Sequence, residues 1–167
     1  MSILKKNDNV LPVWLSGLAA LGLFAGMAWY LAPLEPGVVA LQFAFAPKAF
    51  GEIIHFWSED QLLRFRMHFV ADFAFLLAYG LFGYLLATRT QVFHSLPPPL
   101  SRLAAWMLPA AALFDATENV LHLWLTEMPR FGVQLPYLAA ATCASIKWLL
   151  LLVFTVTLIT AIARSKD

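Results

Sequence analysis

Four polar side chains in the second half of the chain have the types and spacing that chemistry requires. They are Asp115, Glu118, Asn119 and His122, and a helix places them within roughly 100° of one face. The apolar stretch that contains them, residues 103–125, is long enough to cross a lipid bilayer. Because charged groups are costly in hydrocarbon, those in spanning helices face a bundle interior, a cavity or a partner. This polar face is therefore the candidate functional site.

Two other apolar stretches carry polar side chains that are expected to meet this face. They are Asp72 and Tyr79 of residues 68–87, and Lys147 and Trp148 of residues 137–163. At 1.5 Å per helical residue, Asp72 lies about 6 Å, Glu118 about 10 Å and Lys147 about 15 Å below one membrane surface. The depths overlap, so these groups are predicted to meet in the outer half of the bilayer.

The charges of this predicted cluster do not balance. The carboxyls of Asp72, Asp115 and Glu118 face one ammonium group, which gives a net charge of about −2 if all are ionised. The surplus is removed if one carboxyl stays protonated, if an arginine reaches down from the surface, or if a cation, a metal ion or an amine-bearing ligand binds. The arginines within reach are Arg64, Arg66 and Arg130.

The first functional hypothesis is a site for a lipid-like or amine-bearing small molecule. Asp115 and Glu118 would be its acid–base or cation-binding pair, since a carboxyl in an apolar pocket can transfer protons, as in double-bond isomerisation. The sequence leaves open whether the site is catalytic. The other residues expected to bind the ligand are Asp72, Tyr79, Asn119, His122, Lys147 and Trp148.

Two alternatives use the same residues. In one, a Lys147–Asp115 ion pair only locks helices together, and the chain is an accessory subunit that packs against a membrane-protein partner or a second copy. In the other, the cluster is a metal or proton site, and its members are His68, Asp72, Asp115, Glu118 and His122. Those ligand types suit Zn, Mn or Fe. Two helices would have to supply all of these ligands, however, and neither has a Glu-x-x-His motif, so neither a metal nor a cofactor is predicted.

Composition places these groups in a membrane protein. Of 167 residues, 61% are hydrophobic and 13% are charged, whereas about a quarter of a soluble domain is charged. The net charge of +1 comes without a basic block, which argues against a nucleic-acid partner. Cys143 is the single cysteine, so an intramolecular disulfide and cysteine-rich metal sites are excluded.

The elements that must position the site are four apolar stretches, and residues 1–167 are expected to form one domain. We predict an all-α, polytopic four-transmembrane-helix bundle in which Pro109 kinks the third helix. The predicted spans are residues 11–32, 68–87, 103–125 and 137–163.

The segment between the first two spans, residues 38–67, is predicted to be a lid on the outer membrane surface. Residues 47–57 have the pattern of a short amphipathic helix. Ser58 and Gln61 have the form of a capping box, so the next helix is expected to start near Glu59.

Lysine and arginine residues predict the orientation. One side of a four-span arrangement carries Lys5, Lys6, Arg89, Arg102, Arg164 and Lys166, mostly in short segments. The other side carries Lys48, Arg64, Arg66 and Arg130 together with five acids. The bias in short segments favours both termini in the cytoplasm.

Three sequence pieces carry a resemblance to a known group of proteins. They are Leu41-Gln42-Phe43-Ala44-Phe45, Asp72-Phe73-Ala74-Phe75 with Tyr79, and Asp115-x-x-Glu118-Asn119. The pattern resembles that of small bacterial four-span membrane proteins, which implies the bacterial inner membrane but no assigned activity. More remotely, the architecture is similar to the emopamil-binding/sigma-2 (EXPERA) family, whose members bind sterols or amines, and some of which isomerise sterols through buried carboxyls. That family's motif residues do not align here position by position, so this likeness concerns the fold alone.

Overall fold

The computed structural model describes residues 9–165, and this part of the chain is helical without strands. The predicted all-α class is therefore confirmed. The elements are α1 (Leu11–Leu31), α2 (Val38–Gln42), α3 (Pro47–Phe56), α4 (Glu59–Arg89), α5 (Pro98–Glu127) and α6 (Leu135–Arg164).

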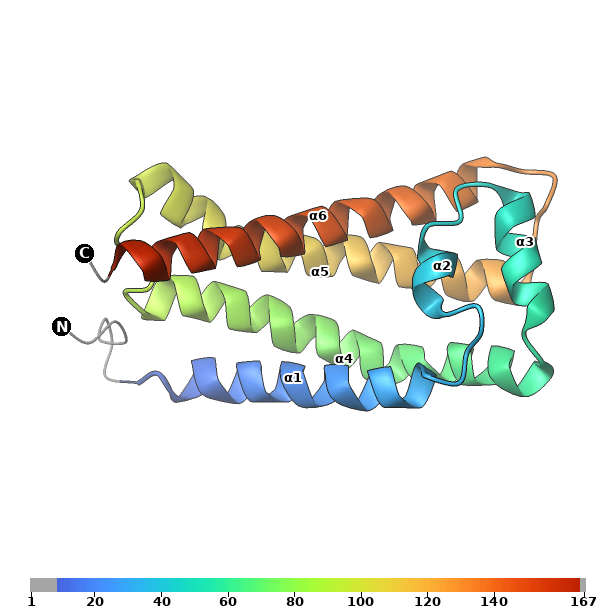
Figure 1. The fold of residues 1–167 in the computed structure, drawn as a ribbon, viewed down its shortest axis with the longest axis horizontal. Coiled ribbons are helices and arrows are strands. Elements are labelled where there is room, and N and C mark those ends of the chain that lie inside the picture. Colours follow the sequence, from blue (N-terminus) through green and yellow to red (C-terminus); the bar gives the residue numbers. More distant parts are fainter. Residues whose placement is uncertain (1–8, 166–167) are drawn as a thin grey trace.

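The four long helices lie alongside one another, and α2 and α3 lie across one end of them (Figure 1). Helix α1 packs against α4, α4 against α5, and α5 against α6. The start of α1 and the end of α6 lie at the opposite end of the molecule from α3 (Figure 1). Helices α1 and α6 therefore flank the α4–α5 pair.

Three of the long helices, α1, α4 and α6, are long and apolar enough to cross a membrane. Helix α5 has 30 residues, as many as α6, but the polar residues from Asp115 to His122 interrupt its apolar sequence. The structure thus supports membrane-spanning character for the helices that contain three of the four predicted spans.

The helix boundaries follow local sequence signals. Helix α4 begins at Glu59, as predicted, because Ser58 Oγ accepts from Gln61 N at 3.2 Å and Gln61 Oε1 accepts from Ser58 N at 2.9 Å. The predicted amphipathic helix is also confirmed, as α3. Helix α5 begins at Pro98, five residues before the predicted start at 103. Proline is favoured at the first helical positions because it has no N–H to satisfy there.

The apolar core has two parts with the polar residues between them. One part, toward the termini, contains Leu76, Met107, Leu108 and Phe154. The other lies under α2 and α3, where the ring of Phe50 packs edge-on against Tyr137 with centroids 5.1 Å apart. Helices α2 and α3 are thereby fixed as a roof over the polar residues.

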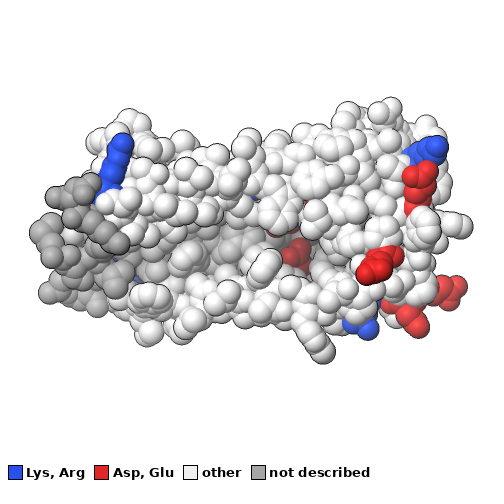
Figure 2. All heavy atoms as spheres, in the orientation of Figure 1, with Lys and Arg blue, Asp and Glu red and all other residues white. Residues whose placement is uncertain are grey.

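Charged side chains lie mainly at the two ends of the molecule. In the view of Figure 2, lysine, arginine, aspartate and glutamate atoms occupy the ends, and the middle carries acidic atoms only in a hollow. Arg89, Arg102 and Arg164 lie in the helical turns at the end opposite α3. The predicted basic residues Lys5, Lys6 and Lys166 lie outside the described residues.

Candidate functional site

The polar face of α5 points into the bundle. The four side chains that the sequence singled out, Asp115, Glu118, Asn119 and His122, are all buried, and Glu118 is fully inaccessible to solvent. Because α5 lies between α4 and α6, this face meets polar groups from both neighbours. The juxtaposition predicted from helical spacing and depth is present in the structure.

Lys147, from α6, joins two of these carboxyls. Its Nζ lies 2.6 Å from Asp115 Oδ1 and 2.7 Å from Glu118 Oε2. Tyr79, from α4, donates to the other oxygen of Asp115 at 3.2 Å. Asp115 thus has a partner on each oxygen, which marks it as the group that holds the three helices in register.

Asp72 is the carboxyl that is not paired with a cation. It is half-buried, lines the cavity described below, and accepts a hydrogen bond from Asn119 Nδ2. The three arginines that could have reached down are engaged elsewhere in the described chain. Arg64 donates to Tyr30 O at 2.9 Å, Arg66 donates to Thr126 O, and Arg130 lies over the ring of Trp124. The structure therefore leaves the surplus of carboxyls over cations in place.

Glu118 is the least satisfied group of the site. His122 Nδ1 lies 3.6 Å from Glu118 Oε1, beyond hydrogen-bonding distance. Oε2 of Glu118 is held by Lys147 at 2.7 Å, whereas Oε1 accepts no hydrogen bond from the described residues. A buried carboxyl oxygen without a hydrogen bond is costly, so a ligand that donates a hydrogen bond to Oε1 would be bound favourably.

The two histidines contribute differently. His122 is buried beside Glu118, and its ring lies 5.9 Å from that of Phe50 in the roof. His68 donates from Nδ1 to Phe65 O and lines the same cavity. Within residues 9–165, no three His, Cys, Asp or Glu side chains are arranged to hold a metal ion. The geometry gives no support to the metal alternative.

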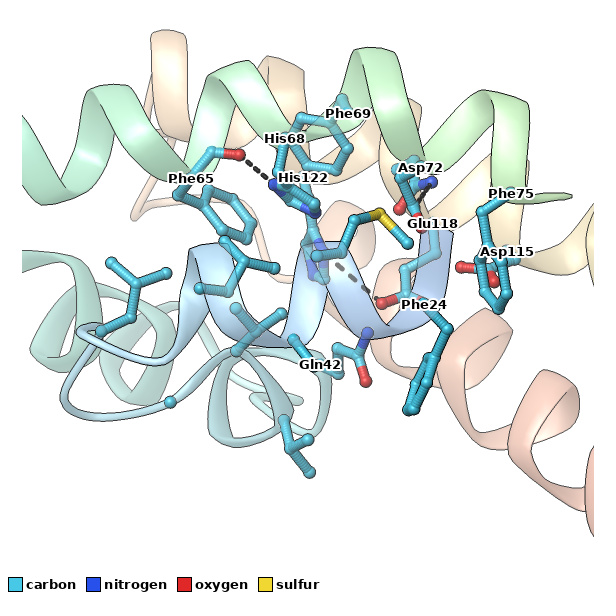
Figure 3. Close-up of a pocket in the computed structure, with 18 of the residues that line it drawn as sticks. Phe24, Gln42, Phe65, His68, Phe69, Asp72, Phe75, Asp115, Glu118 and His122 are labelled. Atoms are coloured by element: carbon cyan, nitrogen blue, oxygen red, sulfur yellow. Dashed lines mark hydrogen bonds and ion pairs between the residues drawn. The ribbon is translucent and has the colours of Figure 1, made fainter. Parts of the chain in front are cut away.

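A cavity of about 480 Å³ reaches these groups. Its floor is formed by Asp72, Asp115, Glu118, Asn119, His122 and Lys147. Its walls are largely apolar and come from α1, α2, α4 and α6, with Phe24, Phe65, Phe69 and Phe75 among them (Figure 3). In Figure 2 acidic atoms are visible at the bottom of the hollow between α1 and α6. The cavity therefore opens sideways, between two helices that are apolar enough to face lipid.

Gln42 lines the cavity and is a site residue that the sequence analysis missed, whereas its partner Trp148 was predicted. Trp148 lies at the mouth of the cavity with 41% of its surface exposed, and its Nε1 donates to Gln42 Oε1 at 3.0 Å. Gln42 is the one polar residue of the α2 sequence Val-Val-Ala-Leu-Gln. A single polar residue in an apolar segment is the sequence signal that could have identified it as a site residue. Its place opposite Trp148, 106 positions away in sequence, depends on tertiary packing.

No family model, curated protein or solved structure matches this chain. The case for a function therefore rests on the site itself.

Proposed function

We propose that the protein is a four-span integral membrane protein that binds a lipid-like small molecule in the cavity between α1 and α6. The observation that carries this proposal is the cavity's composition: apolar walls around a floor of three carboxyls, a lysine, an asparagine and a histidine. A volume of about 480 Å³ lies within the range of small-molecule sites, which combine apolar walls with a few polar groups. The ligand's polar head would contact the floor and its apolar part the phenylalanine rings.

In this proposal α5 is the fourth span. It has 30 residues, packs between α4 and α6, and directs its polar residues inward. Both termini would be cytoplasmic, since Arg89, Arg102 and Arg164 gather at the end where the described chain starts and finishes. The resemblance to small bacterial membrane proteins supports the bacterial inner membrane as the location, with α2 and α3 on its outer side.

Glu118 is the group best suited to act on a bound molecule. Both oxygens of Asp115 are engaged, by Lys147 and by Tyr79, whereas only Oε2 of Glu118 is engaged, by Lys147, and Oε1 has no hydrogen bond from the described residues. A carboxyl enclosed by apolar walls can exchange a proton with a ligand placed against it. Any acid–base step would then use Glu118, and Asp115 would position Lys147.

Native mass spectrometry of the detergent-purified protein, combined with lipid extraction, tests the proposal. We expect a discrete small molecule to co-purify with the wild type and to be lost from Glu118→Gln and Asp115→Asn, because each change removes a floor carboxylate. Glu52→Gln is the matched control, since Glu52 is an exposed acid of α3 outside the cavity.

A thermal melt of each variant separates loss of the ligand from loss of the fold. If nothing co-purifies with the folded wild type, and a partner protein is released by the variants instead, the binding proposal is wrong. The polar face would then serve an accessory subunit.

A further inference from the structure

The position of Gln42 in the roof is fixed on both sides of the residue. Leu41, its neighbour in α2, is fully buried in the core cluster under the roof. The loop before α2 is held by Trp57 Nε1, which donates to Pro36 O at 2.8 Å. Gln42 itself lines the cavity, so α2 presents its side chain to the site from the side opposite the α5 carboxyls.

Trp148 determines which way the Gln42 amide faces. An indole N–H can only donate, so the oxygen of the amide must face Trp148 Nε1, as the 3.0 Å contact requires. The amide nitrogen then faces away from the indole. Figure 3 shows that nitrogen on the side of Glu118, and Nε2 has no hydrogen-bond partner among the described residues.

Three other donors of the site are already bonded to carboxylates. Tyr79 donates to Asp115, Asn119 donates to Asp72, and Lys147 contacts both Asp115 and Glu118. Gln42 Nε2 is an unused donor beside the cavity, and Oε1 of Glu118 is an acceptor without a hydrogen bond. A ligand head placed between them would have to accept one hydrogen bond and donate another.

We propose that Gln42 is a ligand-contacting residue and that the ligand is an amphipathic alcohol whose hydroxyl accepts from Gln42 Nε2 and donates to Glu118. The proposal rests on the function proposed above and narrows its ligand class. A hydroxyl meets both requirements, because it has an O–H and lone pairs. An ammonium group has no lone pair to accept from Gln42, and an anionic head would face the surplus of carboxyls.

The test compares matched probes that share one twelve-carbon chain: dodecanol, dodecyl methyl ether and dodecylamine. Native mass spectrometry in detergent gives the apparent Kd of each probe. We expect the alcohol to bind the wild type about tenfold more tightly than the ether, because the ether cannot donate to Glu118. Gln42→Leu should reduce this preference and leave ether binding within about twofold of the wild type.

Two further variants distinguish a specific loss of alcohol binding from a general loss of the fold. Gln42→Glu retains an acceptor for Trp148 but replaces the amide nitrogen by an oxygen, so it should lose affinity for the alcohol as Gln42→Leu does. Gln134→Leu changes an exposed glutamine outside the cavity and should bind all probes as the wild type does.

The outcomes separate the two proposals. Equal binding of alcohol and ether to the wild type, or tighter binding of the amine, would overturn the hydroxyl assignment while leaving a ligand site in place. Unchanged alcohol binding in both Gln42 variants would overturn the role of Gln42. If the folded wild type binds none of the probes, the proposed function itself fails.

Discussion

Lys147 is the residue on which the polar cluster depends, because one ammonium group lies within 2.7 Å of two carboxylate oxygens. Its side chain is buried, as are those of Asp115 and Glu118. Removing one member of such an arrangement leaves the remaining charges without compensation, which costs about 3–5 kcal/mol for a buried pair. The cluster is therefore expected to govern stability as well as ligand binding.

The Lys147→Met substitution tests whether the polar cluster governs stability. We expect the variant to melt well below the wild type in detergent, by an amount that corresponds to about 3–5 kcal/mol. Combining it with Asp115→Asn and Glu118→Gln should recover much of the loss, since the two carboxylates that Lys147 compensated are then neutral. Lys48→Met is the control, because the exposed Lys48 lies 3.9 Å from Glu52 and such surface pairs contribute about 0–1 kcal/mol. Equal melting of Lys147→Met and the control would contradict the account.

At this scale the sequence predicted the groups that helical spacing places together, and missed those that depend on tertiary contacts. The face from Asp115 to His122 follows from the helical repeat, and Lys147 follows from counting residues along a span. Gln42 does not, because α2 reaches the site only after the chain has folded back over the helix ends. Of the three open ways to balance the charge, an arginine at the cluster is not the one that the structure shows, since backbone carbonyls and a ring engage Arg64, Arg66 and Arg130.

At the scale of elements, the contact between α4 and α5 sets how closely the two polar faces approach. A Cβ atom added at Gly83 of α4 would lie 2.6 Å from Leu108 Cβ of α5, well inside van der Waals contact. The bare glycine backbone therefore allows the close approach that brings Tyr79 within hydrogen-bonding distance of Asp115.

Gly83→Ala should force these helices apart. Overpacking costs about 1–3 kcal/mol, more than the roughly 1 kcal/mol that alanine gains over glycine in a helix. We expect a lower melting temperature and weaker ligand retention. Gly22→Ala of α1 is the matched control, because nothing lies within 4 Å of an added Cβ there, and its stability should be unchanged or higher. Similar melting temperatures for the two variants would show that the α4–α5 contact adapts without cost.

The elements themselves were predictable where a local signal was strong. The capping box at Ser58 gave the start of α4 correctly, since both of its hydrogen bonds form. The start of α5 was placed too late because the proline run was assigned to the preceding loop. Hydropathy alone does not identify α5 as a membrane span, because the polar residues of the site lower the mean hydropathy of this helix.

At the scale of the whole molecule, the order of packing explains where the cavity opens. Since α1 contacts α4 and α6 contacts α5, the two outer helices stand apart over the polar floor. The roof of α2 and α3 closes the end of the bundle, where Phe50, Phe65 and Tyr137 are fully or almost fully buried. A lipid-like ligand would therefore enter sideways from the membrane.

Photo-cross-linking in membranes tests this central claim most directly. An alkyl alcohol that carries a diazirine in its chain would be added to the membrane-embedded protein, with and without an excess of unlabelled dodecanol, and the labelled positions would be mapped by peptide sequencing. The account predicts that the competitor removes labelling at Met27, Leu31 and Leu151, which line the cavity, and leaves labelling at Leu18 and Leu21 on the exposed face of α1. If the competitor changes labelling neither in the cavity nor on the exposed face, there is no specific site, and the account is contradicted.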